Sequence, residues 1–96
     1  MQINDFNSLQ RFLRDNDVFT RYGFKRVGVF GSFARGESFN DIDLLLEDPL
    51  DYESRMSLKR FLETKLQMPV DIIIKDFAEP IILHRALKDM KYATAV

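Results

Sequence analysis

The stretch GSFARGESFNDIDLLLE, residues 31–47, places a Gly-Ser pair and two aspartates ahead of an apolar run. The segment DIDLLLE has the composition of a buried strand, in which residues i and i+2 point to the same face. Asp41 and Asp43 therefore direct their carboxylates into one shared space, where the two charges repel each other. Either water screens such a pair at an exposed strand end, or a cation bridges it. Mg²⁺ suits this position, because it takes one or two protein carboxylates together with substrate phosphates.

The Gly-Ser pair follows KRVGVF, residues 25–30, an apolar stretch that predicts a strand ending at Gly31. A helix is predicted to start again at Ser32, and a junction between strand and helix offers free backbone N–H groups to a phosphate. Gly31 allows the backbone to approach a ligand closely, and Ser32 can donate its hydroxyl to a phosphate oxygen. The pattern predicts a phosphate-binding turn beside the two acids.

A third carboxylate stands inside the apolar stretch VDIII, residues 70–74. An unpaired charge in a buried strand is costly, so Asp71 needs a partner or a function. If this strand lies beside residues 41–47, Asp71 converges with Asp41 and Asp43, and the three carboxylates can hold two Mg²⁺ ions. One ion then carries a nucleoside triphosphate and the other activates an attacking hydroxyl, with Asp71 as a ligand or a proton acceptor. Together with the turn, the acids favour a nucleotidyl-transfer centre over a solvated strand end.

Two other polar side chains, Arg35 and His84, are candidates for contact with a ligand. Arg35 lies in the first turn of the helix that follows Ser32, where its guanidinium can join the nucleotide-binding site. An ion pair with Glu37 or Asp41 is an equally good interpretation of Arg35. His84 falls off the apolar stripe of its helix, so we expect it to be exposed.

The rest of the chain alternates between the helical period and the strand period. Helices are predicted over 5–22 with a break near Asn16, from Ser32, over 51–66 and from Pro80, and strands over 25–30, 41–47, 70–74 and, as a short edge strand, within 91–96. The last helix has an apolar stripe of Ile82, Leu83, Ala86, Leu87 and Met90. This order indicates an α/β (α+β) fold, a small mixed sheet covered by helices. A chain of 96 residues accommodates one core, so we expect a single domain over residues 1–96.

The composition argues against several classes of protein. Fourteen basic and fifteen acidic residues leave a net charge of −1, which provides no large positive field for nucleic acid, so we expect no such partner. The longest apolar runs, such as 44–46 and 72–74, are too short to cross a membrane. Cysteine is absent and the first residues lack the pattern of a secretory signal, so we expect a cytoplasmic protein.

The motifs GSFARGE, DIDLLLE and VDIII, in this order, resemble the DNA polymerase beta-like nucleotidyltransferases. More narrowly, the chain resembles the minimal nucleotidyltransferases, the antitoxin partners of HEPN-domain toxins. The resemblance implies the nucleotidyltransferase fold, Gly31 and Ser32 at the triphosphate of ATP, and Asp41, Asp43 and Asp71 as ligands of Mg²⁺. It also implies the reaction, which is transfer of AMP from ATP to a tyrosine hydroxyl of the toxin. The spacer 33–40 is slightly shorter than is usual in the family.

Two other functions stay open on the sequence alone. The chain can be an antitoxin that neutralises its partner by binding alone, with weak or no catalysis, although a binding protein has no physical need for three carboxylates on strands. It can also modify a small molecule or an RNA end, against which the near-neutral charge and the small size argue. The sequence leaves open whether the chain forms a homo-oligomer.

Overall fold

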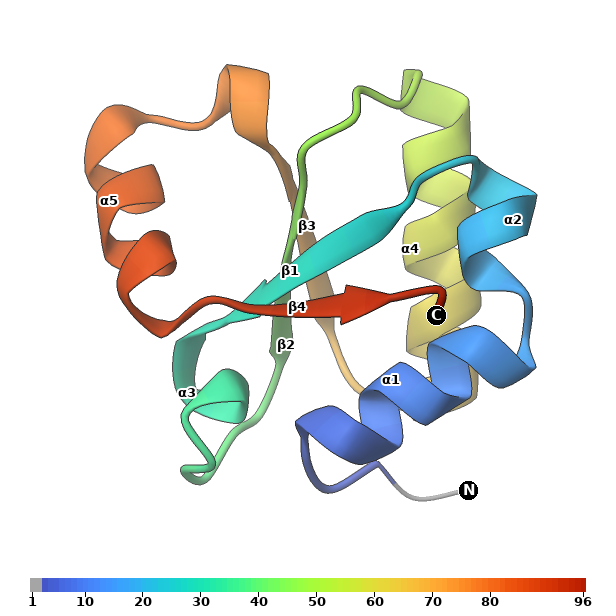
Figure 1. Cartoon of the computed structure of the whole chain (residues 1–96), viewed down its shortest axis with the longest axis horizontal. Coiled ribbons are helices and arrows are strands. Elements are labelled where there is room, and N and C mark those ends of the chain that lie inside the picture. Colours follow the sequence, from blue (N-terminus) through green and yellow to red (C-terminus); the bar gives the residue numbers. More distant parts are fainter. Residues whose placement is uncertain (1–2) are drawn as a thin grey trace.

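Residues 3–96, the part of the chain that the computed structural model describes, form a four-stranded sheet with helices on both faces (Figure 1). The α-helices are α1 (Phe6–Asp15), α2 (Val18–Tyr22), α3 (Gly31–Ala34), α4 (Tyr52–Leu66) and α5 (Pro80–Asp89), and a 3₁₀ turn, η1, covers Lys75–Phe77. The strands are β1 (Arg26–Phe30), β2 (Ile42–Leu46), β3 (Val70–Ile74) and β4 (Lys91–Thr94). The predicted fold class is confirmed, and each element lies within about a turn of its predicted position.

The sheet is mixed, with strand order β3-β2-β1-β4. Strand β1 pairs antiparallel with β2 and with β4, whereas β3 runs parallel to β2. The C-terminal strand β4 lies at one edge, as predicted, and β3 forms the other edge. The register puts Phe30 opposite Asp43, and Asp43 opposite Asp71, so one row of residues crosses three strands at this end of the sheet.

Side-chain caps set the starts of the main helices. The Asp5 carboxylate accepts a hydrogen bond of 2.8 Å from the Ser8 backbone N–H, and Asp51 accepts one of 2.6 Å from Ser54. Each acid satisfies a backbone donor that the first helical turn leaves unpaired. The break predicted near Asn16 is present, because Asp17 has a φ of +54°, which a continuous helix cannot contain.

The two faces of the sheet differ in their covering. Helices α1, α2 and α4 lie on one side of the strands, and α3 and α5 lie on the other (Figure 1). The main core fills the first side, where the buried side chains of Val29, Leu44 and Val70 meet those of Leu9 and Leu58. Because side chains alternate along a strand, Asp43 and Asp71 face the second, less covered side.

The apolar stripe predicted for α5 is only partly buried, which corrects the sequence analysis. Ala86 is buried, but Ile82 and Leu87 are 41% and 52% exposed. The reason is that α5 contacts the sheet mainly along β1, and one strand covers a narrow line of a helix. His84 is exposed, as predicted. Within residues 3–96 no helix combines the length and the apolar character that crossing a bilayer requires.

Candidate active site

The strand register brings the three predicted acids together. Asp43 and Asp71 are direct neighbours in the parallel pair of β2 and β3, and Asp41 immediately precedes β2. Each of the three offers a carboxylate oxygen, and these oxygens all lie within 4.8 Å of one another. The convergence expected if the two strands were adjacent is therefore present. Sequence spacing predicted the pair on β2, and the pairing with β3 supplies the third acid.

The charges of this acidic cluster are not neutralised by the protein. Asp41 and Asp43 are partly buried and Asp71 is exposed. Within residues 3–96 none of the three carboxylates accepts a hydrogen bond from a side chain or the backbone, or pairs with a basic group. Burial, followed by the charges of Asp41 and Asp71, raises the pKa of Asp43 to about 6. Partly desolvated carboxylates that converge without a counter-charge are the donor set that a hard divalent cation requires. The residues therefore fit a site for a divalent cation.

Gly31 lies against this cluster. Its φ of +81° is in the left-handed region, which favours glycine, and a Cβ at this position would lie 2.5 Å from Oδ2 of Asp43. The Gly-Ser turn is thus packed directly on the acids. The shorter spacer 33–40 does not separate Gly31 from Asp43, because the pairing of Phe30 with Asp43 sets their distance. Ser32 follows in the first turn of α3, partly buried, and its hydroxyl forms no hydrogen bond within residues 3–96.

Arg35 forms ion pairs in the structure. Its Nη1 donates a hydrogen bond of 2.7 Å to Oδ2 of Asp89, and its Nε lies 3.1 Å from Oε1 of Glu37. These pairs, first that with Asp89 and then that with Glu37, raise the pKa of the Arg35 guanidinium. The expected pair with Glu37 is present and that with Asp41 is not. Asp89 is 54 residues away in the chain, so no local signal predicted it.

Two cavities adjoin the cluster, and the sequence analysis found neither. One of about 400 Å³ is lined by Asp43 and Asp71 and by Arg55, Met56 and Lys59 of α4. The other, of about 260 Å³, is lined by residues of the Gly31 turn and of α5. The spacing of Arg55 and Lys59, four residues apart on a helix, indicates a shared face but not its neighbour. Only the packing of α4 beside β3 places that face near the acids.

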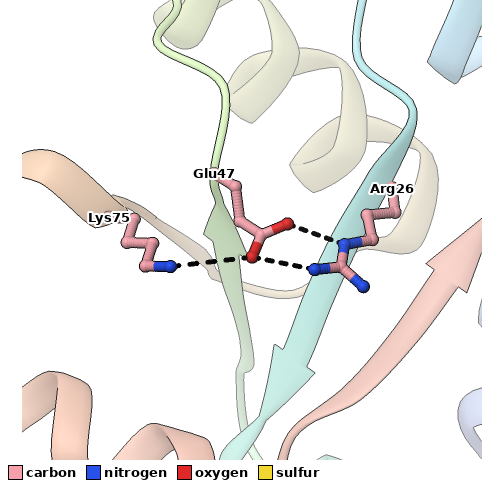
Figure 2. A network of polar contacts seen from close by, with 3 residues as sticks. All are labelled: Arg26, Glu47 and Lys75. Carbon is pink, nitrogen blue, oxygen red and sulfur yellow. Dashed lines mark hydrogen bonds and ion pairs between the residues drawn. The ribbon is translucent and has the colours of Figure 1, made fainter.

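The opposite end of β2 carries a carboxylate in a different setting. Glu47 accepts hydrogen bonds of 2.7 and 3.1 Å from the Arg26 guanidinium, and Nζ of Lys75 lies 3.9 Å away (Figure 2). Figure 2 shows the three side chains in a row from β1, from the end of β2 and from the residue after β3. This carboxylate is paired on both sides, so basic groups of the protein already compensate its charge.

Comparison with known proteins gives consistent matches. The sequence profile of the family "Polymerase beta, Nucleotidyltransferase" matches residues 8–92. The chain is 32% identical over 80 residues to the protein adenylyltransferase MntA of Thermococcus cleftensis, and the aligned region covers 75% of this chain and 77% of that protein. A solved minimal nucleotidyltransferase is similar at 30% identity with a TM-score of 0.67, covering 91% of this chain and 94% of that one. A solved MntA toxin–antitoxin complex contains a chain similar at 26% identity and a TM-score of 0.68, covering 94% and 72%.

Proposed function

We propose that this chain, which belongs to the polymerase beta nucleotidyltransferase family and is a protein adenylyltransferase, transfers AMP from ATP to a tyrosine hydroxyl of a HEPN-domain toxin. The transfer silences the toxin, so the chain acts as its antitoxin. The observation that carries the proposal is the acidic cluster, whose oxygens lie within 4.8 Å of one another beside Gly31. The similarity to a protein adenylyltransferase and to a chain of a toxin–antitoxin complex supports the class of acceptor.

The residues of the site divide into two groups. Gly31 and Ser32 bind the triphosphate through backbone N–H groups and a hydroxyl. Asp41, Asp43 and Asp71 would hold Mg²⁺, and we expect two ions. When bound, these ions neutralise the charge of the triphosphate and lower the pKa of the attacking hydroxyl. The raised pKa of Asp43, about 6, means that the carboxylate ionises fully only above that pH.

The chemical step is a single displacement at the α-phosphorus of ATP. The acceptor oxygen forms a bond to this phosphorus, and the bond from it to the oxygen that bridges to the β-phosphorus breaks. Pyrophosphate leaves with the electron pair of that bond, and a carboxylate oxygen of Asp71 accepts the hydroxyl proton. The protein contributes position and charge rather than a covalent intermediate.

Arg35 has a secondary place in this proposal. Its guanidinium is held by Asp89 and Glu37 at the entrance of the turn that carries Gly31 and Ser32. We propose that it contacts the nucleotide from this position, with a hydrogen bond to a phosphate oxygen in place of one of its two ion pairs. An Arg35→Lys variant keeps the charge but not the planar fork, and should bind ATP more weakly.

The test is the intact mass of the partner toxin after incubation with this protein, ATP and Mg²⁺. An Asp41→Ala, Asp43→Ala double variant is the control. We expect the toxin to gain whole AMP units, mapped to tyrosine, with the wild type only. An unmodified toxin in a stable complex would overturn the proposal in favour of neutralisation by binding alone.

A further inference from the structure

The cavity of about 400 Å³ beside α4, called the α4 cavity below, has no role in the function proposed so far. It is large enough for a small ligand or a single large side chain. Its walls are unequal in character: Asp43 and Asp71 lie at one end, Met56 and Ile72 provide apolar surface, and Arg55 adds a positive charge. A cavity that begins at two of the three acids is well placed to admit one of the reacting groups.

The register of the strands shows on which side of the site this cavity lies. In the row that crosses the sheet, Phe30 of β1 faces Asp43 of β2, and Asp43 faces Asp71 of β3. Gly31 follows Phe30, so the Gly-Ser turn is at the β1 end of the row and Asp71 is at the β3 end. The α4 cavity continues beyond Asp71, because α4 packs along β3, the edge strand. The acids thus separate the Gly-Ser turn from the cavity.

The geometry of phosphoryl displacement assigns the two sides. The attacking and leaving oxygens stand roughly in line on opposite sides of the reacting phosphorus. With the triphosphate at the Gly-Ser turn, pyrophosphate leaves toward β1 and the hydroxyl arrives from the β3 side. On the basis of the proposed function, we propose that the α4 cavity is the acceptor site and receives the tyrosine side chain of the partner protein.

The residues that line the α4 cavity suit the phenol side chain of a tyrosine. A tyrosine presents an apolar ring, which suits Met56 and Ile72, and a hydroxyl at its far end, which reaches Asp71. Arg55 forms no ion pair within residues 3–96, and its guanidinium already lies 5.7 Å from the ring centroid of Tyr52, so it is able to stack on an aromatic ring. Lys59 is fixed to the wall, since its Nζ donates hydrogen bonds to the Val70 carbonyl at 2.6 Å and to Glu63 at 3.2 Å.

The experiment separates acceptor binding from nucleotide binding. Met56→Trp fills the cavity, Arg55→Ala removes its free cation, and Arg60→Ala, at an exposed position of the same helix, is the matched control. For each protein we would measure the dependence of AMP transfer on toxin concentration, and the affinity for a non-hydrolysable ATP analogue with Mg²⁺. Thermal unfolding of each variant verifies that it is folded. Arg55→Ala leaves the apolar wall of the cavity intact, so it still tests the proposal if Met56→Trp does not fold.

We expect Met56→Trp and Arg55→Ala to lower kcat/KM for the toxin by at least about tenfold, with the affinity for the analogue and the Arg60→Ala control within about twofold of wild type. A parallel loss of affinity for the analogue would overturn the proposal and make the cavity a nucleoside site. Unchanged transfer in both variants would also overturn it. If the wild type itself modified no toxin, the proposed function would fail, which is a different result from failure of the cavity assignment alone.

Discussion

Two carboxylates, Asp43 in β2 and Glu47 directly after β2, face the same side of the sheet and meet opposite surroundings. Glu47, at the end of the strand, lies between Arg26 and Lys75 (Figure 2). Asp43, four residues earlier, lies between Gly31, which has no side chain, and Asp71, which repeats its charge. Positions four residues apart in an extended segment share a face, so the difference comes from burial and from the residues that surround each carboxylate.

The pKa values of the two acids differ accordingly. The hydrogen bonds from Arg26, with its charge and that of Lys75, hold the pKa of Glu47 below its usual value. Burial and two neighbouring carboxylates raise the pKa of Asp43 to about 6. One end of the strand has satisfied its charge within the fold, and the other end keeps negative charge available for a ligand from outside. The missing counter-charge, rather than the presence of an acid, therefore distinguishes the candidate site.

The largest expected effect is on catalysis. Asp43→Asn should lower AMP transfer by about 10²–10³-fold, because it removes a carboxylate that would hold the Mg²⁺ needed to neutralise the triphosphate. Glu47→Gln, a matched change on the same face directly after β2, should leave the rate within about threefold of wild type. Initial rates of toxin modification with saturating ATP measure both. Equal losses in the two variants would mean that the ends of the strand do not differ in function.

The second effect concerns Gly31, the residue directly after β1, which lies against Asp43. Gly31→Ala should lower transfer by about 10²-fold, since the new Cβ meets the Asp43 carboxylate and displaces it. Gly36→Ala is the control, because Gly36 has a similar φ, +76° against +81°, but an added Cβ there meets nothing within 4 Å. Both variants should lose about 1 kcal/mol of stability from backbone strain. Comparable activities in the two variants would contradict a role for the contact with Asp43.

The third effect is on stability without metal. Neutralising Asp43 and neutralising Glu47 should change the free energy of unfolding in opposite directions. The folded protein binds the Asp43 proton more tightly than the unfolded chain does, so this residue lowers stability as the pH rises from about 4 to about 6. In the presence of a chelator at pH 7.5, Asp43→Asn should be more stable than wild type by about 1 kcal/mol, a value reduced for the partial exposure of the group. Glu47→Gln should be less stable by about 0.5–1 kcal/mol, since the lowered pKa of Glu47 stabilises the fold above its unfolded value of about 4.5.

Urea denaturation of both variants and the wild type between pH 4 and pH 8 measures this difference. The Asp43→Asn curve should lack the fall of the wild type between pH 4 and 6. A loss of stability in Asp43→Asn at pH 7.5 would show that the acid supports the fold instead of straining it.

The smallest effect lies within the network of Figure 2. Arg26→Ala should destabilise the protein more than Lys75→Ala does, because Arg26 makes two hydrogen bonds to Glu47 and its guanidinium lies 3.9 Å from the ring centroid of Tyr92. Lys75→Ala should cost less than about 0.5 kcal/mol, since its nitrogen is 3.9 Å from the same carboxylate and is exposed. Thermal unfolding in low salt gives both values. A larger cost for Lys75→Ala would mean that the network depends on total charge rather than on hydrogen-bond geometry.

The sequence by itself determined the elements and the acids of the candidate site. Apolar spacing, capping acids and glycines are local signals, so they predicted the strands, the helices and the break near Asn16 without knowledge of the fold. The candidate site residues were likewise recognisable from a few adjacent residues each: the spacing of Asp41 and Asp43, the Gly-Ser pair after a strand, and Asp71 inside an apolar stretch.

The tertiary structure alone decided how these pieces meet. Strand order and register decided that Asp71 joins Asp43 while Glu47 meets Arg26 and Lys75. The burial of Asp43 together with these neighbours sets the direction in which each pKa moves. The ion pair of Arg35 with Asp89, the exposure of the α5 stripe and the α4 cavity also depend on which segments pack together. Contacts between residues far apart in the chain are set by strand order, register and packing, which local propensity and periodicity do not encode.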